Sequence, residues 1–359
     1  HPYRGRRLLT FNDSRQGTAR IAAKLQQESE RNRVRGLVYH LALRGGVQRS
    51  EAEATNLQKE IAEDEALLPL IPTKEARSII EGRLTEKRRT LDSLSQPTPI
   101  PFDDMARQLA NQGQDFDRMW RHYRDDVSHE TNGDPEGSLD LARMFLVREF
   151  GRRPKRLNNL ESMGLVAVCY PELNKKITSP HRGFTLDEWR SFLKIALDFF
   201  VRAGGSLSVS KSCRHWLGIP FPQTWLIERD RKEKATDERR WPRAQYTLKK
   251  GKKQPNIRST LVRLLAYVLN ADIDTAYGED VVDAALDAAW KALTDESGIL
   301  QAAGGGRRIL PVNQVAFAPI TTAWVCPVTR RFLDTTFRGI TPYLPLKYSD
   351  ATAKCRQVK

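Results

Sequence analysis

The stretch RRLLTFNDSRQGTAR, residues 6–20, carries most of the information about the fold. Its apolar run LLTF (8–11) has the length and composition of a buried strand. The next three residues, 12–14, are Asn, Asp and Ser, which all favour the N-cap position of a helix. A strand that enters a helix through a short polar turn is typical of α/β proteins, where the helix N-terminus can offer N–H groups to a phosphate. We therefore predict a strand and then a helix whose first turn contains Arg15 and Gln16.

Size, composition and charge limit the class of protein. The chain has 359 residues, of which 40% are hydrophobic, so we expect a globular protein of two or three domains. The net charge of +15 points first to nucleic acid and then to an anionic membrane surface. No apolar run reaches the roughly 18 residues of a membrane helix, and no signal peptide is visible. We expect a cytoplasmic protein without a membrane partner and, because the chain starts at His1, a fragment of something longer.

The cysteines indicate a reducing compartment. Cys169, Cys213, Cys326 and Cys355 lie far apart and form no C-x-x-C pair. The motif CPVT (326–329) resembles half of a zinc knuckle whose second cysteine is missing, so the sequence disfavours a metal here.

The predicted fold is mostly α-helical with an α/β portion. Five segments are expected: the strand and helix of an α/β lobe (1–47), a helical hairpin (48–100), a helical unit with a small winged fold (101–180), a helical domain with a basic loop and a winged-helix-like end (181–320), and a β-hairpin with a tail (321–359).

Segment 48–100 favours a structural arm over a catalytic unit. It contains two charged stretches with leucine and isoleucine at helical spacing, separated by Pro69 and Pro72. This pattern is typical of an antiparallel helical hairpin or a short coiled coil.

Residues 257–319 give the second fold signal. Two amphipathic helices precede the segments GILQAA and ILPVNQVAFAP, which we interpret as the strands of a hairpin joined by the turn GGGRR. Two helices followed by a hairpin are the pattern of a winged helix. Arg307 and Arg308 are then expected at the hairpin tip, as phosphate contacts.

Two further basic stretches suggest nucleic-acid contacts. Residues 229–258 hold twelve Lys or Arg against four acids, with Trp241 and Tyr246 among them, and show little apolar periodicity. We predict a loop or extended arm there, which either follows a nucleic-acid backbone or is simply solvated. The other stretch is a corner between helices at 152–156.

Catalytic motifs are not apparent. The sequence has no Walker A motif, no G-x-S-x-G and no H-E-x-x-H, and its six histidines are scattered. No catalytic residue is therefore assigned.

Three stretches carry a resemblance to a known family. LLTFNDSRQGTARIAAKLQ (8–26) resembles the F-S-D-S-R-Q-D-A-A segment that opens the second RecA-like domain of large bacterial superfamily 2 helicases of the DEAD/DEAH-box type, including those of DISARM- and Druantia-like phage defence and of DNA repair. Asn12 and Gly17 differ from the residues of that family segment at the same positions. VREFGRRPKRLNNLESMGLV (147–166) and AFAPITTAWVCPVTRRFLDTTFRGITPY (316–343) are similar to stretches of the same large proteins.

The resemblance implies a fragment that starts at the second RecA-like lobe of an ATP-dependent DNA helicase or translocase. ATP and Mg would then be bound only by the intact protein, and DNA and other defence-system subunits would be its partners. The segment that matches residues 11–16 is taken to contact the nucleic-acid backbone in that family. The alternative is a non-enzymatic winged-helix DNA-binding or assembly subunit.

Thirteen residues are expected to bind nucleic acid through phosphates. They are Ser14, Arg15, Gln16, Arg152, Arg153, Lys155, Arg156, Lys249, Lys250, Lys252, Lys253, Arg307 and Arg308.

Overall fold

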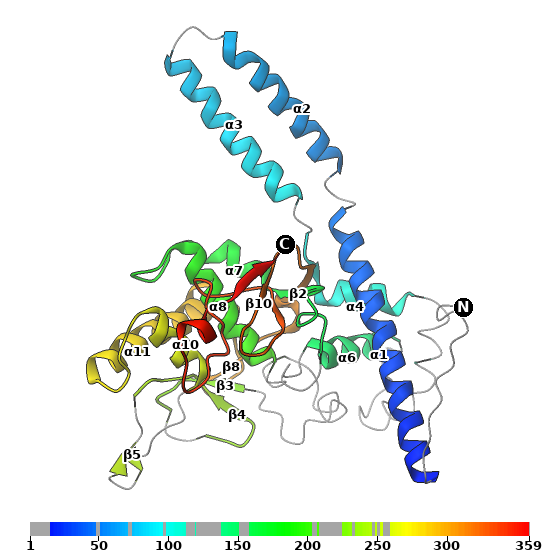
Figure 1. Cartoon of the computed structure of the whole chain (residues 1–359), viewed down its shortest axis with the longest axis vertical. Coiled ribbons are helices and arrows are strands. Elements are labelled where there is room, and N and C mark those ends of the chain that lie inside the picture. Colours follow the sequence, from blue (N-terminus) through cyan, green and yellow to red (C-terminus); the bar gives the residue numbers. More distant parts are fainter. Residues whose placement is uncertain are drawn as a thin grey trace.

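The fold is a helical body with small sheets and one projecting arm (Figure 1). The computed structural model describes residues 15–47, 51–70, 74–95, 98–112, 119, 138–150, 158–202, 207, 225–231, 234–245, 248–249, 252–253 and 259–358. Helices predominate, and the sheets have two to four strands each. The predicted mixture of α-helix with a smaller α/β portion is confirmed at this level.

Helix α1 (Arg15–Val47) begins directly after the predicted cap residues. The predicted strand 8–11 and Ser14 lie outside the described residues. The middle of α1 buries Val34 and Val38, and the helix packs against the strand β9 and the helix α4 of the body. The long helix predicted after the opening motif is therefore present and is part of the core.

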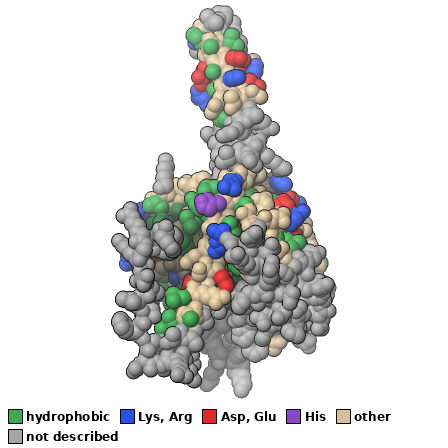
Figure 2. Space-filling model, turned by 90° about the vertical axis from the view of Figure 1, so that its right-hand side faces the viewer, with side chains coloured by type: hydrophobic (Ala, Val, Ile, Leu, Met, Phe, Trp, Pro, Cys, Tyr) green, Lys and Arg blue, Asp and Glu red, His purple; other side chains and the backbone are tan. Residues whose placement is uncertain are grey.

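The predicted helical hairpin is also present, and it projects from the body (Figure 1). It consists of α2 (Glu51–Leu67), the short 3-10 turn η1 (Leu68–Leu70) and α3 (Lys74–Ser95). Ile61 and Leu84 are buried between the two helices. Figure 2 shows acidic and basic side chains interspersed over the outer surface of this arm. Such mixed charge keeps an extended helical pair soluble.

The body is centred on a three-stranded antiparallel sheet of order β1-β9-β2. Its strands and helices are β1 (Ile100–Pro101), α4 (Phe102–Ala110), α6 (Ser138–Phe150), β2 (Val166–Cys169), α7 (Pro171–Lys176), α8 (Leu186–Val201) and β9 (Ala316–Pro319). Phe317 on β9 is opposite Val168 and is fully buried, with its ring 4.6 Å from that of Phe150. The central strand of the body therefore comes from the last quarter of the chain.

A four-stranded sheet of order β4-β3-β8-β7 lies beside the helices α10 and α11. The strands of the sheet are β3 (Trp225–Ile227), β4 (Glu238–Arg240), β7 (Gln301–Ala302) and β8 (Arg307–Ile309). The helices beside it are α10 (Thr260–Val268), α11 (Ala276–Lys291) and the π-helical turn η2 (Ala292–Glu296). β3 and β4 are parallel, and the other pairs are antiparallel.

The predicted hairpin around GGGRR is only partly correct. β7 and β8 do pair, and Gly304, Gly305 and Gly306 all have positive φ in the turn between them. However, the second strand ends at Ile309, and Pro311 precedes the 3-10 turn η3 (Val312–Gln314). Segment 316–319 joins the central sheet because its apolar side chains are buried there, so a two-stranded wing over this whole region is wrong.

The chain ends in a small β-unit that we call the C-terminal unit, residues 320–358. It consists of β10 (Ala323–Val325), β11 (Phe332–Leu333), α12 (Asp350–Ala353) and β12 (Arg356–Val358), in the sheet order β11-β10-β12. The predicted hairpin around CPVT is present as β10 and β11. β12 adds a third strand that the sequence did not indicate.

None of the described helices is both long and apolar enough to pass through a bilayer.

A buried ion pair fixes α1 to the body. Glu149 on α6 is 3% exposed and accepts from Arg31 Nε at 2.9 Å and from Arg35 Nε at 2.7 Å. It also accepts from the backbone N–H of Leu160 at 3.0 Å. Arg31 and Arg35 are four residues apart and so lie on one face of α1. This carboxylate therefore joins three segments.

We expect Glu149→Gln to destabilise the protein by about 2–3 kcal/mol, because two buried guanidinium groups lose their counter-charge while the amide still accepts one hydrogen bond. Urea unfolding measures the change. Glu63→Gln, at an exposed position on α2, is the control and should change stability by no more than about 0.5 kcal/mol. Equal effects of the two variants would contradict the docking role of Glu149.

Candidate functional site

Several of the predicted site residues lie outside the described residues. These are Ser14, Arg152, Arg153, Lys155, Arg156 and Lys250. Arg15 and Gln16 are the first two residues of α1, at the N-terminus where the sequence places them.

The predicted basic loop contains a β-hairpin. β5 (Leu248–Lys249) pairs antiparallel with β6 (Lys252–Lys253), so that Lys249 is opposite Lys252 and Leu248 is opposite Lys253. The hairpin lies at the edge of the molecule (Figure 1). We call residues 248–253 the lysine hairpin; it holds four lysines in six positions.

A part of the predicted basic loop packs into the core, where Glu238, Trp241 and Ala244 are buried. Trp241 is 2% exposed, stacks on Phe200 at 5.2 Å between ring centroids, and donates its indole N–H to the carbonyl of Leu286 at 2.8 Å. An indole held in this way has no free face for a base. The expectation of a solvated loop or an arm along a nucleic-acid backbone is wrong at Trp241, because tertiary burial overrides the polar character of its neighbours.

Arg307 and Arg308 lie on strand β8 and not at the glycine tip. Arg307 Nε donates to Glu238 at 2.5 Å, and Arg308 is 3.5 Å from Asp295. Both arginines thus have acidic neighbours, which lowers the net positive charge that they offer to a phosphate.

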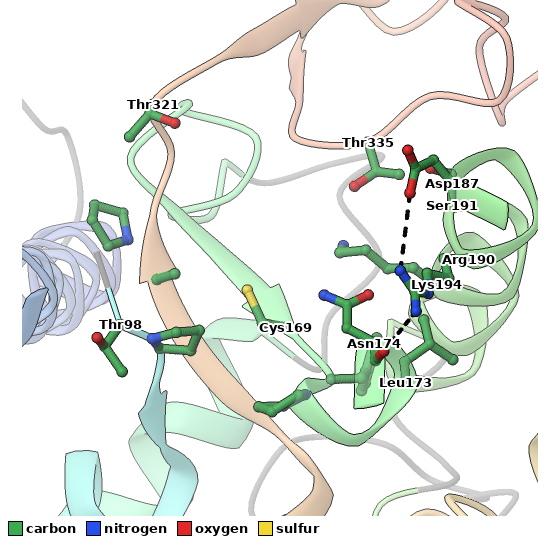
Figure 3. Close-up of a pocket in the computed structure, with 15 residues that line it drawn as sticks. Thr98, Cys169, Leu173, Asn174, Asp187, Arg190, Ser191, Lys194, Thr321 and Thr335 are labelled. Atoms are coloured by element: carbon green, nitrogen blue, oxygen red, sulfur yellow. Dashed lines mark hydrogen bonds and ion pairs between the residues drawn. The ribbon is translucent and has the colours of Figure 1, made fainter. Parts of the chain in front are cut away.

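A cleft of about 650 Å³ opens between the central sheet and α8 (Figure 3). It is lined by Thr98, Pro99, Cys169, Tyr170, Pro171, Leu173, Asn174, Asp187, Arg190, Ser191, Lys194, Ala318, Pro319, Thr321 and Thr335. α8 supplies four of its polar side chains at a spacing of three to four residues. We call it the α8 cleft. Its volume is in the range of small-molecule sites.

The two basic groups of the cleft already have partners. Arg190 donates to the carbonyls of Asn174 at 2.7 Å and of Ile177 at 2.8 Å, at the C-terminal end of α7. Lys194 Nζ is 2.8 Å from Asp198 and 2.6 Å from Asp334. The cleft is therefore polar, but it is not a strong anion site.

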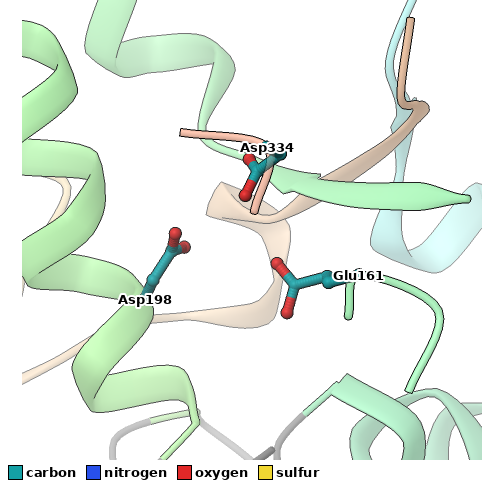
Figure 4. A group of neighbouring side chains, drawn as sticks. All are labelled: Glu161, Asp198 and Asp334. Carbon is teal, nitrogen blue, oxygen red and sulfur yellow. The ribbon is translucent and has the colours of Figure 1, made fainter. Parts of the chain in front are cut away.

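Three carboxylates near the cleft residue Lys194 point toward a common centre (Figure 4). Glu161, Asp198 and Asp334 each offer an oxygen within 4.8 Å of the others. They come from the turn before β2, from α8 and from the segment after β11. We call them the carboxylate cluster. Their positions would suit a hard cation if they were free.

Two cations neutralise most of this cluster. Lys194 bridges Asp198 and Asp334, and Arg202 donates to Glu161 from Nε at 3.2 Å and from Nη2 at 3.0 Å. Arg202 Nη1 also donates to the Tyr343 hydroxyl at 2.8 Å. The carboxylates thus have ammonium and guanidinium partners where a metal would supply charge, so the cluster is an ion-pair network.

Besides Lys194 and Arg202, Tyr170 also contacts the carboxylate cluster. Its hydroxyl donates to Asp198 Oδ1 at 2.9 Å. Burial raises the pKa of Tyr170 well above its usual value, with the Asp198 charge acting in the same direction. The phenol therefore remains a neutral donor at physiological pH.

The protonation states of Cys169 and Lys194 argue against either side chain as a nucleophile in the cleft. Burial raises the pKa of Cys169 to about 12, so it remains a thiol. Burial opposes the charge of Lys194, but Asp198 and Asp334 outweigh it and raise the pKa of the amine above its usual value. Burial also raises the pKa of Glu161, against the attraction of Arg202. Cys169 and Lys194 are thus both held in their protonated forms, in which neither side chain is a nucleophile.

The sequence contained a signal for this network that the predictions did not use. Asp187, Ser191, Lys194 and Asp198 form a polar line along one face of a helix that is largely apolar elsewhere, and Asp198 at its inner end is flanked by apolar residues. A charged pair on a buried face needs further partners.

The chain matches no protein-family model, no curated protein and no solved structure.

We expect Lys194→Met to destabilise the protein by about 3–5 kcal/mol, because Asp334 would lose its ammonium partner and Asp198 would keep only one cation, the more distant Arg202, at 3.6 Å. The free energy of unfolding measures the effect. Lys175→Met, on a side chain that is 70% exposed, removes the same charge and should cost no more than about 0.5 kcal/mol. Adding Asp334→Asn to Lys194→Met should recover part of the loss; a double variant no more stable than Lys194→Met would contradict the network.

A second ion pair joins the C-terminal unit to the start of α8. Arg338 donates to both oxygens of Glu188, from Nε at 2.8 Å and from Nη2 at 3.0 Å. Its Nη2 also donates to the carbonyl of Gly183 at 2.9 Å. The hydrogen bond from Arg338 is the main cause that lowers the pKa of Glu188 to about 2.

The Arg338–Glu188 pair should make stability depend on pH. A carboxylate whose pKa falls on folding stabilises the protein above its unfolded pKa, and this contribution is lost as pH falls through the folded value. We expect Arg338→Ala to lower Tm above pH 4.5, and the difference from the unmodified chain to shrink toward pH 2. The pair is partly exposed, so the effect is at most about 1 kcal/mol.

Thermal unfolding at a series of pH values measures this prediction. Arg330→Ala is the matched control, because Arg330 has the same left-handed backbone, φ 58° against 53°. A Tm difference for Arg338→Ala that does not change between pH 7 and pH 2 would contradict it.

Proposed function

We propose that this chain binds the phosphate backbone of DNA and is a segment of a bacterial ATP-dependent DNA helicase or translocase that acts in phage defence or repair. The observation that carries the DNA-binding part is the lysine hairpin, in which a strongly basic segment forms a defined β-structure at the edge of the molecule.

The register of the lysine hairpin supports an anionic partner. Lys249 and Lys252 occupy directly opposed positions, and like charges at such positions destabilise an antiparallel pair. A two-stranded hairpin is marginal in water even without that repulsion. A polyanion at this place would remove the repulsion and stabilise the hairpin, which is the electrostatic basis of backbone binding.

The start of α1 supports a second contact to the same backbone. Its first turn contains Arg15 and Gln16 and no acidic residue, and the first N–H groups of a helix favour an anion. The resemblance to the helicase segment 11–16 adds to this argument. In the proposed whole protein, ATP and Mg bind between this lobe and one outside the chain.

DNA binding tests the proposal. We expect the chain to bind fluorescently labelled single-stranded or duplex DNA, with an affinity that falls steeply as salt increases and depends little on sequence. Replacing Lys249, Lys250, Lys252 and Lys253 by Ala should weaken binding and reduce the slope of log K against log salt. The reduction should be about 0.7–0.9 for each lysine that contacts a phosphate.

The matched control removes four exposed lysines from scattered positions: Lys175, Lys234, Lys347 and Lys354. It has the same net charge as the hairpin variant. A localised site predicts that the control keeps most of the salt slope. Equal losses in the two variants would mean that only the overall charge matters, and no binding at low salt would reject DNA binding.

A further inference from the structure

A pair of cysteines lies in the C-terminal unit, and neither of them lines the α8 cleft. β10 and β12 pair antiparallel with Val325 opposite Arg356. The next opposed positions in that register are Cys326 and Cys355. The two cysteines are 29 positions apart in the sequence (355 − 326), and only the added strand β12 brings them together.

The distance between opposed positions suits a disulfide. Directly opposed residues in an antiparallel pair have Cα atoms about 4.5–5.5 Å apart, and a disulfide needs about 4.4–6.8 Å. The two thiols also lie close enough for each to shift the pKa of the other. The register of the strands therefore suits a bond between the two sulfurs.

The Cys326 sulfur is surrounded by donors. It accepts the backbone N–H of Thr329 at 3.3 Å and lies 2.9 Å from Thr341 Oγ1. Thr341 Oγ1 already accepts the N–H of Tyr343 at 3.2 Å, so its own proton is available to the sulfur. Backbone and hydroxyl donors on one sulfur favour the thiolate over the thiol.

The electrostatics of the pair agree with this geometry. The hydrogen bond from Cys355, with further ones from Thr329 and Thr341, lowers the pKa of Cys326 to about 5 against the effect of burial. The same contact raises the pKa of Cys355, which keeps its proton. The pair therefore consists of a thiolate and the thiol that can resolve it, whereas Cys169 is held as a thiol by burial.

We propose that Cys326 and Cys355 form a reversible disulfide when the protein meets a peroxide. In the first step the Cys326 thiolate attacks one oxygen of hydrogen peroxide, the O–O bond breaks, and hydroxide leaves, which gives a sulfenic acid. In the second step the Cys355 sulfur attacks the Cys326 sulfur, the S–O bond breaks, and the thiol proton leaves with the oxygen as water. Two thiols are oxidised and one peroxide is reduced to water.

The disulfide would close a loop that contains every contact of the C-terminal unit to α8 described above. Asp334, Arg338 and Tyr343 all lie between the two cysteines. Their partners are Lys194 and Glu188 on α8, and Arg202 at its C-terminal end. Closing this loop restricts the unfolded chain, so the oxidised protein should unfold at a higher temperature.

Peptide mapping of the whole chain tests the proposal. The reduced protein is treated with hydrogen peroxide in slight excess, free thiols are blocked with N-ethylmaleimide, and the digest is analysed by mass spectrometry. We expect a peptide that links Cys326 to Cys355, its loss after dithiothreitol, and a higher Tm before reduction. Sulfinic acid at Cys326 without a link, or oxidation of Cys169 first, would overturn the proposal.

Two variants make the test specific. Cys355→Ser should stop the reaction at a sulfenic acid on Cys326, which dimedone traps, and it should abolish the rise in Tm. Cys169→Ser, in the α8 cleft, is the matched control and should keep both the linked peptide and the rise in Tm. If Cys355→Ser kept the rise in Tm, the stabilisation would not come from this disulfide.

Discussion

The buried charge network of Glu161, Lys194, Asp198, Arg202 and Asp334 is the constraint on which the body of this protein depends. Charges in a low-dielectric interior must be paired, and two of the pairs here, Lys194 with Asp334 and Arg202 with Glu161, join segments far apart in the sequence. α8 contributes Lys194 and Asp198, and Arg202 follows directly at its C-terminal end. The turn before β2 and the C-terminal unit must therefore come to α8, because their carboxylates would otherwise be buried without partners. The network thus determines where the last forty residues dock.

The same pairing decides what the α8 cleft can do. Lys194 lines the cleft, but its charge is directed to Asp198 and Asp334, and Arg190 closes the end of α7. Because both cations of the cleft have partners and its thiol is protonated, the cleft offers a small molecule polar contacts but no unpaired cation. The α8 cleft and the net positive charge of the chain are therefore separate features. The cations at the cleft are paired, and the lysines of the proposed DNA contact lie in the lysine hairpin.

The sequence predicts what depends on local pattern. The helices α1, α2 and α3 follow from apolar periodicity, from the cap residues before α1 and from the prolines between α2 and α3. The prediction of strand pairing fails where the partner strand is far away in the sequence. Phe317 was assigned to a wing strand because nothing near it shows that β1 and β2 are its neighbours. Likewise, Cys326 lacks its partner in the CPVT motif, and only the register of β12 supplies Cys355.

The buried carboxylates and the lysines of the hairpin differ in whether opposite charges lie next to them in the structure. In the interior, Glu149 and Asp198 each have two or more donors, so these charges are satisfied within the chain. In the lysine hairpin, Lys249 faces another lysine across the strands. The interior charges are thus paired within the chain, whereas the register of the hairpin places positions of the same sign opposite each other. The DNA backbone of our proposal would supply the opposite sign along an extended path. The position of these lysines, and not the total charge of the chain, is therefore the stronger argument for the proposed contact.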